Sequence, residues 1–317
     1  MKNCLLLFPL SFYSFSKRIQ EYLISEGYKV ELINDEFPNN LFGKLMGEFQ
    51  IPIQQRITEK VITDNYLKDK RYDLILIFKG RGMSKSLINK FKSVSPKVIG
   101  YNFDSFLYFK NSLKWYKNLT KYSTFDYNDS INHSIPQVEL FSSLPSNSNE
   151  NIKKYSLSVI VRNHSNRLKY INGIFKDLKE KDTFIFIYEK NILSFIVNFL
   201  NNPIHYIKYW NHISFKPLDY KAYIDVLQTS NFTLDLAHPK QSGITIRCFE
   251  ALSCGTKIIT NNKYVTKNSF FNRDNTIFHD LKMQSLQLNY NKIKDNTPKK
   301  IHRTIEDFMF EILNTKK

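Results

Sequence analysis

The sequence predicts an α/β protein made of two doubly wound domains that face a cleft. Apolar runs of strand length alternate with helical patterns from residue 3 to residue 104, and the alternation starts again at residue 157. Between the halves, residues 142–156 are rich in Ser, Asn and Pro and have no apolar period, which indicates a linker. Because apolar strands separated by helices are typical of parallel sheets covered on both faces, each half is expected to form one such sheet.

The first half is predicted from short-range patterns. The helix ending at Gly27 has Phe15, Ile19 and Leu23 on one face, and Ser84 opens a later helix. We expect strands at 3–10, 28–34, 72–80 and 97–104, and helical segments at 14–27, 41–70 and 84–94.

The second half repeats this alternation and ends in an amphipathic helix. We expect strands at 157–163, 183–190, 231–237 and 256–260, and helices at 166–180, 192–202, 219–230, 242–255 and 301–317. A chain of 317 residues fits two domains of ordinary size. Ligands of open parallel sheets bind beyond the carboxyl ends of the strands, so the cleft is the default site.

The stretch LDLAHPKQSGITIRCFEALSCGTKIIT, residues 234–260, reads as strand, loop, helix, tight turn and strand. Ser242 stands where a helix cap belongs, and Gly243 would let a ligand approach the backbone. A helix N-terminus attracts anions. Arg247 and Glu250 share the helix face that is expected to look into the cleft, where Glu250 could accept hydrogen bonds from ribose. This predicts a nucleotide site; the alternative is an ordinary capped helix in which Glu250 pairs with Arg247.

The same stretch resembles the C-terminal-domain signature of GT-B glycosyltransferases, in which a strand, a glycine, a helix with a glutamate, Ala-Leu-x-x-Gly and a further strand follow one another. It is most similar to the versions in bacterial surface-polysaccharide transferases of the lipopolysaccharide and capsule type. The resemblance covers the whole chain as architecture, but it is specific in sequence only around this stretch. It implies an N-terminal acceptor-side Rossmann-like domain at 1–145, a C-terminal nucleotide-sugar-binding Rossmann-like domain at 155–300 and a C-terminal helix at 301–317.

The resemblance also assigns residues. It implies that Glu250 holds the ribose and that the diphosphate is held by Gln241, Ser242, Gly243 and Ile244. Many retaining members carry a second glutamate where this chain has Ser242, so retaining chemistry is not implied. His238 and the proline after it are similar to the His-Pro pair of sialyltransferases. Similar transferases place phosphate-binding basic residues after the first strand of this domain, where Arg162 and Arg167 stand.

Two residues of the first half are candidates for the acceptor side. Asp104 ends a strand, and a carboxylate there could deprotonate an acceptor hydroxyl or serve only as a structural cap. Ser11 follows the first strand. The histidines show no paired metal spacing and there is no Asp-x-Asp, so neither a metal nor another cofactor is predicted.

The net charge of +17 indicates an anionic partner or a solvated basic surface. From Lys85 to Lys121 there are eight lysines and one acidic residue, with aromatic residues between them. This mixture predicts attachment to an anionic membrane surface, with nucleic-acid binding as the alternative that no motif supports.

The three cysteines have neither metal spacing nor a disulfide framework, which favours a reducing, cytoplasmic setting. The opening apolar run is too short for a spanning helix and lacks a cleavage site, so we expect at most peripheral attachment to the inner face of the cell membrane.

The sequence therefore predicts an enzyme that moves a sugar from a nucleotide-activated donor to a glycan or lipid-linked glycan. The expected mechanism is positioning together with electrostatic stabilisation of the leaving phosphate. A sugar-nucleotide epimerase of similar architecture and a basic nucleic-acid-binding module are the two alternatives.

Overall fold

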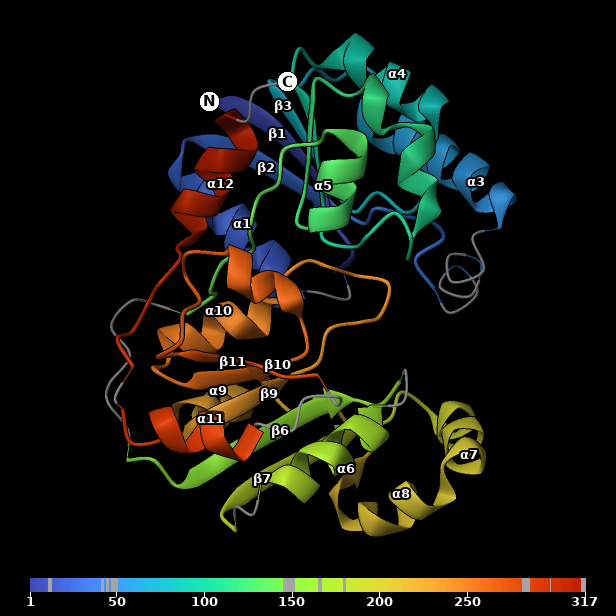
Figure 1. The fold of residues 1–317 in the computed structure, drawn as a ribbon. Coiled ribbons are helices and arrows are strands. Elements are labelled where there is room, and N and C mark those ends of the chain that lie inside the picture. Colours follow the sequence, from blue (N-terminus) through green and yellow to red (C-terminus); the bar gives the residue numbers. More distant parts are fainter. Residues whose placement is uncertain are drawn as a thin grey trace. The chain divides into compact units, whose positions relative to one another are not determined.

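The computed structural model describes residues 1–10, 13–40, 43, 46, 51–144, 152–164, 167–178, 181–280, 286–296 and 298–314. The chain divides into two compact units (Figure 1). Unit 1 comprises Met1–Ser143, Lys240–Gly243 and Thr304–Lys317, and unit 2 comprises Leu144–Pro239 and Ile244–Arg303. Each unit contains a parallel sheet, so the predicted α/β class with two parallel sheets is confirmed.

Unit 1 has a five-stranded sheet in the order β2-β1-β3-β4-β5. The strands are β1 (Lys2–Leu7), β2 (Tyr28–Ile33), β3 (Leu74–Phe78), β4 (Val98–Asn102) and β5 (Lys121–Thr124). The helices are α1 (Tyr13–Ser25), α3 (Pro52–Ile62), α4 (Lys85–Val94), α5 (Tyr127–His133) and α12 (Ile305–Asn314). As expected, Ser84 caps α4, where its Oγ accepts from the backbone N–H of Leu87 at 3.0 Å.

The sheet of unit 1 is buried on both faces, as its uninterrupted apolar strands predict. On one face, Leu5 and Ile75 pack in a cluster with Ile62 of α3 and Phe91 of α4. On the other, aromatic rings of the strands meet rings of α1 and α12; the ring centroids of Tyr101 and Phe308 lie 5.0 Å apart. Figure 1 shows α12 beside α1. The C-terminal helix thus completes the core of unit 1.

Unit 2 has a six-stranded parallel sheet in the order β11-β10-β9-β6-β7-β8. The strands are β6 (Tyr155–Arg162), β7 (Thr183–Tyr188), β8 (Ile213–Ser214), β9 (Ser230–Asp235), β10 (Lys257–Thr260) and β11 (Thr276–Phe278). The helices are α6 (Arg167–Asp177), α7 (Ile192–Asn201), α8 (Pro203–Lys208), α9 (Tyr220–Gln228), α10 (Ile246–Ser253) and α11 (Leu286–Ile293).

Helices cover both faces of this sheet as well. On one face, apolar residues of the strands, among them Val159 and Phe232, pack in a cluster with Ile171 of α6 and Tyr290 of α11. On the other, α9 and α10 contact β9 and β10. The predicted tight turn between α10 and β10 is made by Gly255, whose φ of +64° is a conformation that side chains disfavour. The turn therefore needs glycine at this position.

Candidate functional site

The sheet of unit 2 reverses its strand order between β6 and β9. From β6 the chain builds β7 and β8 on one side and then β9, β10 and β11 on the other. A reversal of this kind leaves a crevice beyond the carboxyl ends of the two central strands, where ligands of open α/β sheets bind. These ends are Arg162 of β6 and Asp235 of β9.

Two partly buried guanidinium groups lie at this reversal. Arg167 donates from Nη1 to the carbonyl oxygen of Arg162 at 3.1 Å and from Nη2 to that of Leu236 at 2.6 Å. It therefore joins the segments that follow β6 and β9. Arg247, in the first turn of α10, places Nη1 3.6 Å from Oδ1 of Asp235. In the described part of the chain, the Nε atoms of Arg167 and Arg247 are buried without a hydrogen-bond partner.

The arginines also influence one another electrostatically. Burial, followed by the neighbouring charge of Arg247, lowers the pKa of Arg167 to about 10, while Asp235 opposes the shift. Arg162 adds a third, exposed positive charge. Three arginines thus lie at the reversal, where Asp235 interacts with Arg167 and Arg247, and the excess positive charge with two unbonded Nε–H groups suits an anion of phosphate chemistry.

Asp235 is a residue of this site that sequence reasoning missed. Its Oδ1 accepts from the hydroxyl of Thr245 at 2.7 Å, and the carboxyl group is almost completely buried. It therefore fixes the start of α10 and orients Arg247. The signal that could have revealed it is its position as the last residue of a buried strand beside the reversal.

Two histidines border the arginine cluster. The ring of His238, predicted to bind the donor, lies 5.4 Å from that of His164. Burial, with Arg167 and His238 nearby, lowers the pKa of His164 to about 3, so its ring is neutral at pH 7. The contribution of His238 to binding stays a prediction.

Glu250 is not exposed as the sequence predicted. Its Oε1 accepts from the hydroxyl of Tyr220 at 2.8 Å and its Oε2 from the hydroxyl of Tyr223 at 2.9 Å. The expectation that Glu250 lies on an open face of α10 is wrong, because Glu250 itself is buried. Burial raises the pKa of Glu250, while the two tyrosine hydroxyls and Arg247 act against the rise. Its role toward ribose stays a prediction.

The expected helix start at Ser242 is also wrong. α10 begins at Ile246, with Thr245 at the N-cap position and no side-chain cap bond. Ser242 belongs to unit 1, where its N–H and Oγ donate to the carboxylate of Asp126 at 2.6 and 2.7 Å. These two hydrogen bonds to Asp126 hold Ser242 in the loop before α10. Ile244 is completely buried in unit 2.

Gly243 approaches protein atoms closely in this structure. A Cβ at this position would lie 2.3 Å from Cδ2 of Phe125 in unit 1, so the ring requires glycine here. Gln241, likewise in unit 1, donates from Nε2 to Oδ1 of Asp104 at 2.8 Å. Whether Gln241, Ser242, Gly243 and Ile244 contact a diphosphate stays a prediction.

Asp104 lies beyond the carboxyl end of β4, as predicted. Its Oδ1 accepts from Gln241, and its Oδ2 forms an ion pair with Lys79. Lys79 has a left-handed φ of 64°, which is uncommon for a residue with a side chain and marks a tight turn after β3. Both carboxylate oxygens are therefore engaged, and the role of Asp104 as a base stays a prediction. Ser11 lies outside the described residues.

The segment from Lys85 to Lys121 does not present the aromatic rim that was expected. Phe91, Tyr101, Phe106, Phe109, Trp115 and Tyr116 are all buried in unit 1, and among its predicted aromatic residues only Tyr108 is exposed. These rings form the core because their sheet and helices pack around them. The expectation of an aromatic membrane rim here is therefore wrong.

The described residues contain no group of three or more His, Cys, Asp or Glu that could hold a metal ion. Among the same residues, no helix is both long and apolar enough to cross a bilayer.

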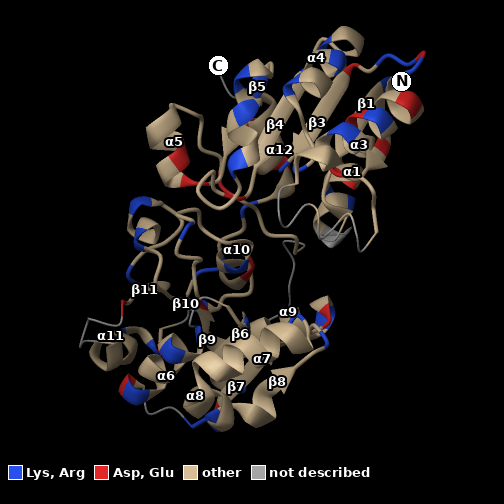
Figure 2. Cartoon of the chain, turned by 90° about the vertical axis from the view of Figure 1, so that its right-hand side faces the viewer, with Lys and Arg blue, Asp and Glu red and all other residues tan. Residues whose placement is uncertain are grey.

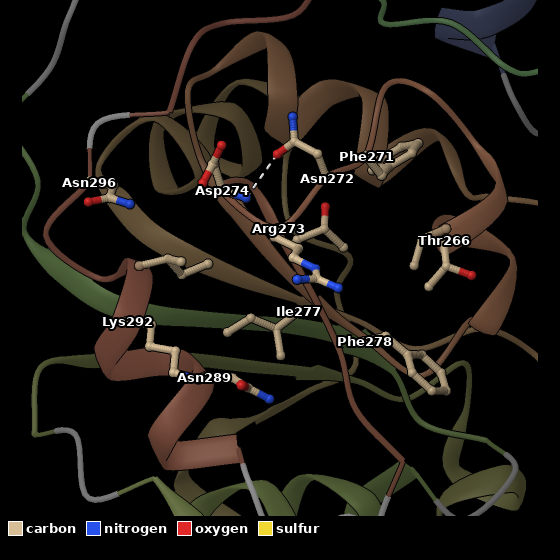
Figure 3. A pocket seen from close by; sticks show the side chains of 13 residues that line it. Thr266, Phe271, Asn272, Arg273, Asp274, Ile277, Phe278, Asn289, Lys292 and Asn296 are labelled. Carbon is tan, nitrogen blue, oxygen red and sulfur yellow. Dashed lines mark hydrogen bonds between the residues drawn. The ribbon is translucent and has the colours of Figure 1, made fainter.

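A cavity of about 670 Å³ lies elsewhere in unit 2, against β11 and α11 (Figure 3). Figure 3 shows Arg273 near its middle and Lys292 and Asn289 of α11 to one side. None of the predicted site residues lines it. This cavity thus supplies an arginine outside the candidate site, which is useful as a control.

Part of the chain is similar to a known family of domains. Residues 196–303 match the family Glyco_trans_1_2, described as "Glycosyl transferase-like". No protein of curated function matches this chain in sequence.

Solved structures resemble it over nearly its whole length. The apo form of the lipopolysaccharide outer core galactosyltransferase WaaB has a TM-score of 0.56 at 11% identity, covering 99% of each chain. AviGT4, a glycosyltransferase involved in Avilamycin A biosynthesis, has a TM-score of 0.55 at 10% identity, covering 94% of this chain and 89% of that one. The UDP-GlcNAc 2-epimerase of Methanocaldococcus jannaschii in complex with UDP-GlcNAc and UDP has a TM-score of 0.56 at 12% identity, covering 100% of both. Identities this low show the fold alone, which is GT-B-like.

Proposed function

We propose that this protein transfers a glycosyl group from a nucleotide-activated donor to a glycan or lipid-linked glycan of a bacterial surface polysaccharide. The observation that carries the proposal is the arginine cluster at the β6–β9 reversal, with two buried Nε–H groups that lack partners. A diphosphate presents several oxygens within reach of adjacent guanidinium groups, which bind such oxygens in a planar, paired geometry.

The donor diphosphate binds to Arg167 and Arg247, and the exposed Arg162 adds a positive charge at the rim of the site. As the bond between sugar and phosphate breaks, negative charge grows on the leaving phosphate. Fixed positive groups in a partly buried site stabilise that charge without reorganising, which lowers the barrier. No metal ion or other cofactor is part of the proposal.

Glu250 accepts hydrogen bonds from the ribose after one tyrosine bond is exchanged. Tyr220 is the tyrosine that moves, because it is partly exposed and lies at the start of α9. Tyr223 keeps the second carboxylate oxygen occupied and holds Glu250 in place.

The acceptor is activated by Asp104 in unit 1. Its carboxylate must then exchange the contact with Gln241 or Lys79 for an acceptor hydroxyl. Asp104→Asn should abolish transfer and leave nucleotide affinity unchanged, because the variant keeps the shape of the side chain and loses the basic oxygen.

A titration of nucleotides tests the proposal. UDP, GDP, CMP and ADP are added in turn to the purified protein, and the melting temperature and calorimetric heat are measured. One of them should bind, and at 100 times its dissociation constant it should stabilise the fold by about 2.7 kcal/mol. Binding of RNA or DNA without affinity for any of the four would overturn the proposal in favour of a nucleic-acid-binding module.

The reaction itself separates transfer from epimerisation. The cognate nucleotide sugar is incubated with and without a lipid-linked glycan, and the sugar of the donor is followed by mass spectrometry and NMR. Release of the nucleoside diphosphate that requires the acceptor supports transfer. Conversion of the donor sugar into its epimer without any acceptor would show the alternative activity.

A further inference from the structure

Helix α7 carries large apolar side chains on its outer surface. None of its residues, Ile192–Asn201, is buried. Of the 21 large apolar side chains that are exposed among the described residues, nine lie between Ile192 and Phe215. They are Ile192, Leu193, Ile196, Val197, Leu200, Ile204, Ile207, Trp210 and Phe215, with exposed fractions from 45% to 79%. We name these nine residues the α7–α8 apolar surface.

The inner face of α7 packs against the rest of unit 2. Phe195 and Phe199 point toward α8, and their ring centroids lie 5.4 and 5.8 Å from that of Tyr206. Both phenylalanines pack against the core of unit 2. The exposed residues of α7 recur after one, four, five and eight positions, which is the period of the opposite helix face. Helix α7 thus has apolar residues on both faces, of which the inner ones are packed and the outer ones are exposed.

The exposed residues belong to elements that pack beside one another, since α7 contacts α8. The ring of Phe195 also contacts those of Trp210 and Phe215, at centroid distances of 5.7 and 5.5 Å. These contacts hold the two exposed aromatic residues beside α7. Figure 2 shows α7 and α8 on the side of unit 2 that faces the viewer, with no charged residue along α7. Monomeric proteins rarely gather so many large exposed apolar side chains on neighbouring elements without a partner.

The charges around the surface are of one sign. From Lys190 to Leu218 the sequence contains no Asp or Glu. Lys190, Lys208 and Lys216 are exposed there. Lysine stems lie along apolar surface and keep the ammonium in water, and aromatic residues favour the interface between headgroups and acyl chains. An anionic bilayer matches both the apolar face and its basic rim, whereas a second copy would bring two basic rims together.

We propose that the α7–α8 apolar surface docks unit 2 onto an anionic lipid bilayer. The apolar side chains enter the boundary between headgroups and acyl chains, and the three lysines contact the anionic headgroups. This assigns membrane contact to unit 2, whereas the sequence pattern had indicated the segment from Lys85 to Lys121. The proposal does not depend on glycosyl transfer, because vesicle binding needs neither donor nor acceptor.

Binding to vesicles tests the proposal. The full chain is sedimented with vesicles of phosphatidylglycerol and phosphatidylcholine, and with vesicles of phosphatidylcholine alone. We expect binding to the anionic vesicles that weakens at high salt. Trp210 gives a second signal: it is exposed whereas Trp115 is buried, so vesicles should shift the tryptophan emission to shorter wavelengths through Trp210. Absence of binding, or equal binding to both vesicle types, overturns the proposal.

A matched pair of variants locates the contact. Leu193→Glu/Leu200→Glu should lower the vesicle partition coefficient at least tenfold. Ile24→Glu/Leu288→Glu replaces two other exposed apolar residues by the same charges and should leave partitioning within about twofold. Both pairs alter exposed positions, and circular dichroism checks that each variant folds. An equal effect of the two pairs shows that added negative charge alone matters and overturns the assignment.

Lys208→Glu/Lys216→Glu should reduce binding to anionic vesicles and remove most of its salt dependence.

Analytical ultracentrifugation without lipid tests whether a second copy of the chain binds this surface. A dimer of the unaltered protein that dissociates in Leu193→Glu/Leu200→Glu would identify a second copy as the partner and overturn the lipid proposal.

Discussion

Replacing Arg167 by alanine separates a binding role from a structural role. The side chain donates to two backbone carbonyl oxygens, and bonds of this kind contribute about 0.5 to 1.5 kcal/mol each to stability. Against this, burial and then the charge of Arg247 lower its pKa to about 10. At about 1.4 kcal/mol per pH unit, burial and repulsion cost the charged side chain roughly 3 kcal/mol. The two effects offset one another, so the unliganded variant should keep its free energy of unfolding within about 1 kcal/mol.

The nucleotide should respond quite differently. A charge-assisted hydrogen bond to phosphate contributes about 1.5 to 3 kcal/mol, so Arg167→Ala should weaken binding of the cognate nucleoside diphosphate by roughly 10- to 150-fold. Inorganic pyrophosphate, which lacks base and ribose, should lose affinity by a similar factor. Calorimetric titration measures both affinities, and urea denaturation measures the stability.

Arg273→Ala is the control, because Arg273 lines the separate cavity against β11. It should change neither the affinity for the nucleotide nor that for pyrophosphate. The opposite result for Arg167→Ala would refute the reasoning: a loss of more than about 2 kcal/mol of stability with unchanged affinity. Arg167 would then serve to join the segments after β6 and β9 without binding the donor.

Four other predictions concern the site and the fold. Glu250→Ala should lower the free energy of unfolding by about 3 kcal/mol in urea titrations, because the hydroxyl of Tyr223 loses its acceptor; unchanged stability would contradict the bonding seen here. Gly243→Ala should lower the free energy of unfolding by about 1 to 3 kcal/mol, and this loss should be smaller in a protein that also carries Phe125→Ala. Additive losses in the double variant would argue against the close contact. Burial raises the pKa of Asp129 to about 7, so the folded state binds the proton of this carboxyl group more tightly than the unfolded state, and the free energy of unfolding should fall as pH rises from about 4 to 7. In denaturation curves at several pH values, Asp129→Asn should reduce this fall by up to about 4 kcal/mol. An unchanged pH profile of the variant would contradict the prediction. Transfer should continue in EDTA, and complete loss restored by Mn²⁺ or Mg²⁺ would show that a metal takes part.

The sequence by itself determined most of the longer strands and helices in both units, because each depends on residues close together in the chain. Apolar runs such as those of β1 and β3, the cap at Ser84 and the turn at Gly255 are local signals, and the structure contains all of them. The short elements β5, β8, β11, α5, α8 and α11 were missed, because a few residues carry too little periodicity to be recognised.

Only some residues of the candidate site were predicted from the sequence. Arg162 and Arg167 were predicted from the resemblance to GT-B glycosyltransferases, and Arg247 was predicted from its position on one face of the helix after Gly243. Asp235, which orients Arg247, was overlooked because the sequence does not say which neighbour a strand-end carboxylate meets.

Only the tertiary structure decided how exposed the site residues are. Helical periodicity placed Glu250 on the polar face of α10, but the hydroxyls of Tyr220 and Tyr223 in α9 cover that face. Likewise, the sequence predicted a helix at 192–202 but not which of its apolar residues are covered: Phe195 and Phe199 pack against the core of unit 2, and the other apolar residues of α7 remain exposed. A hydrophobic pattern reports which residues avoid water, and the positions of distant elements determine which of them find protein to pack against.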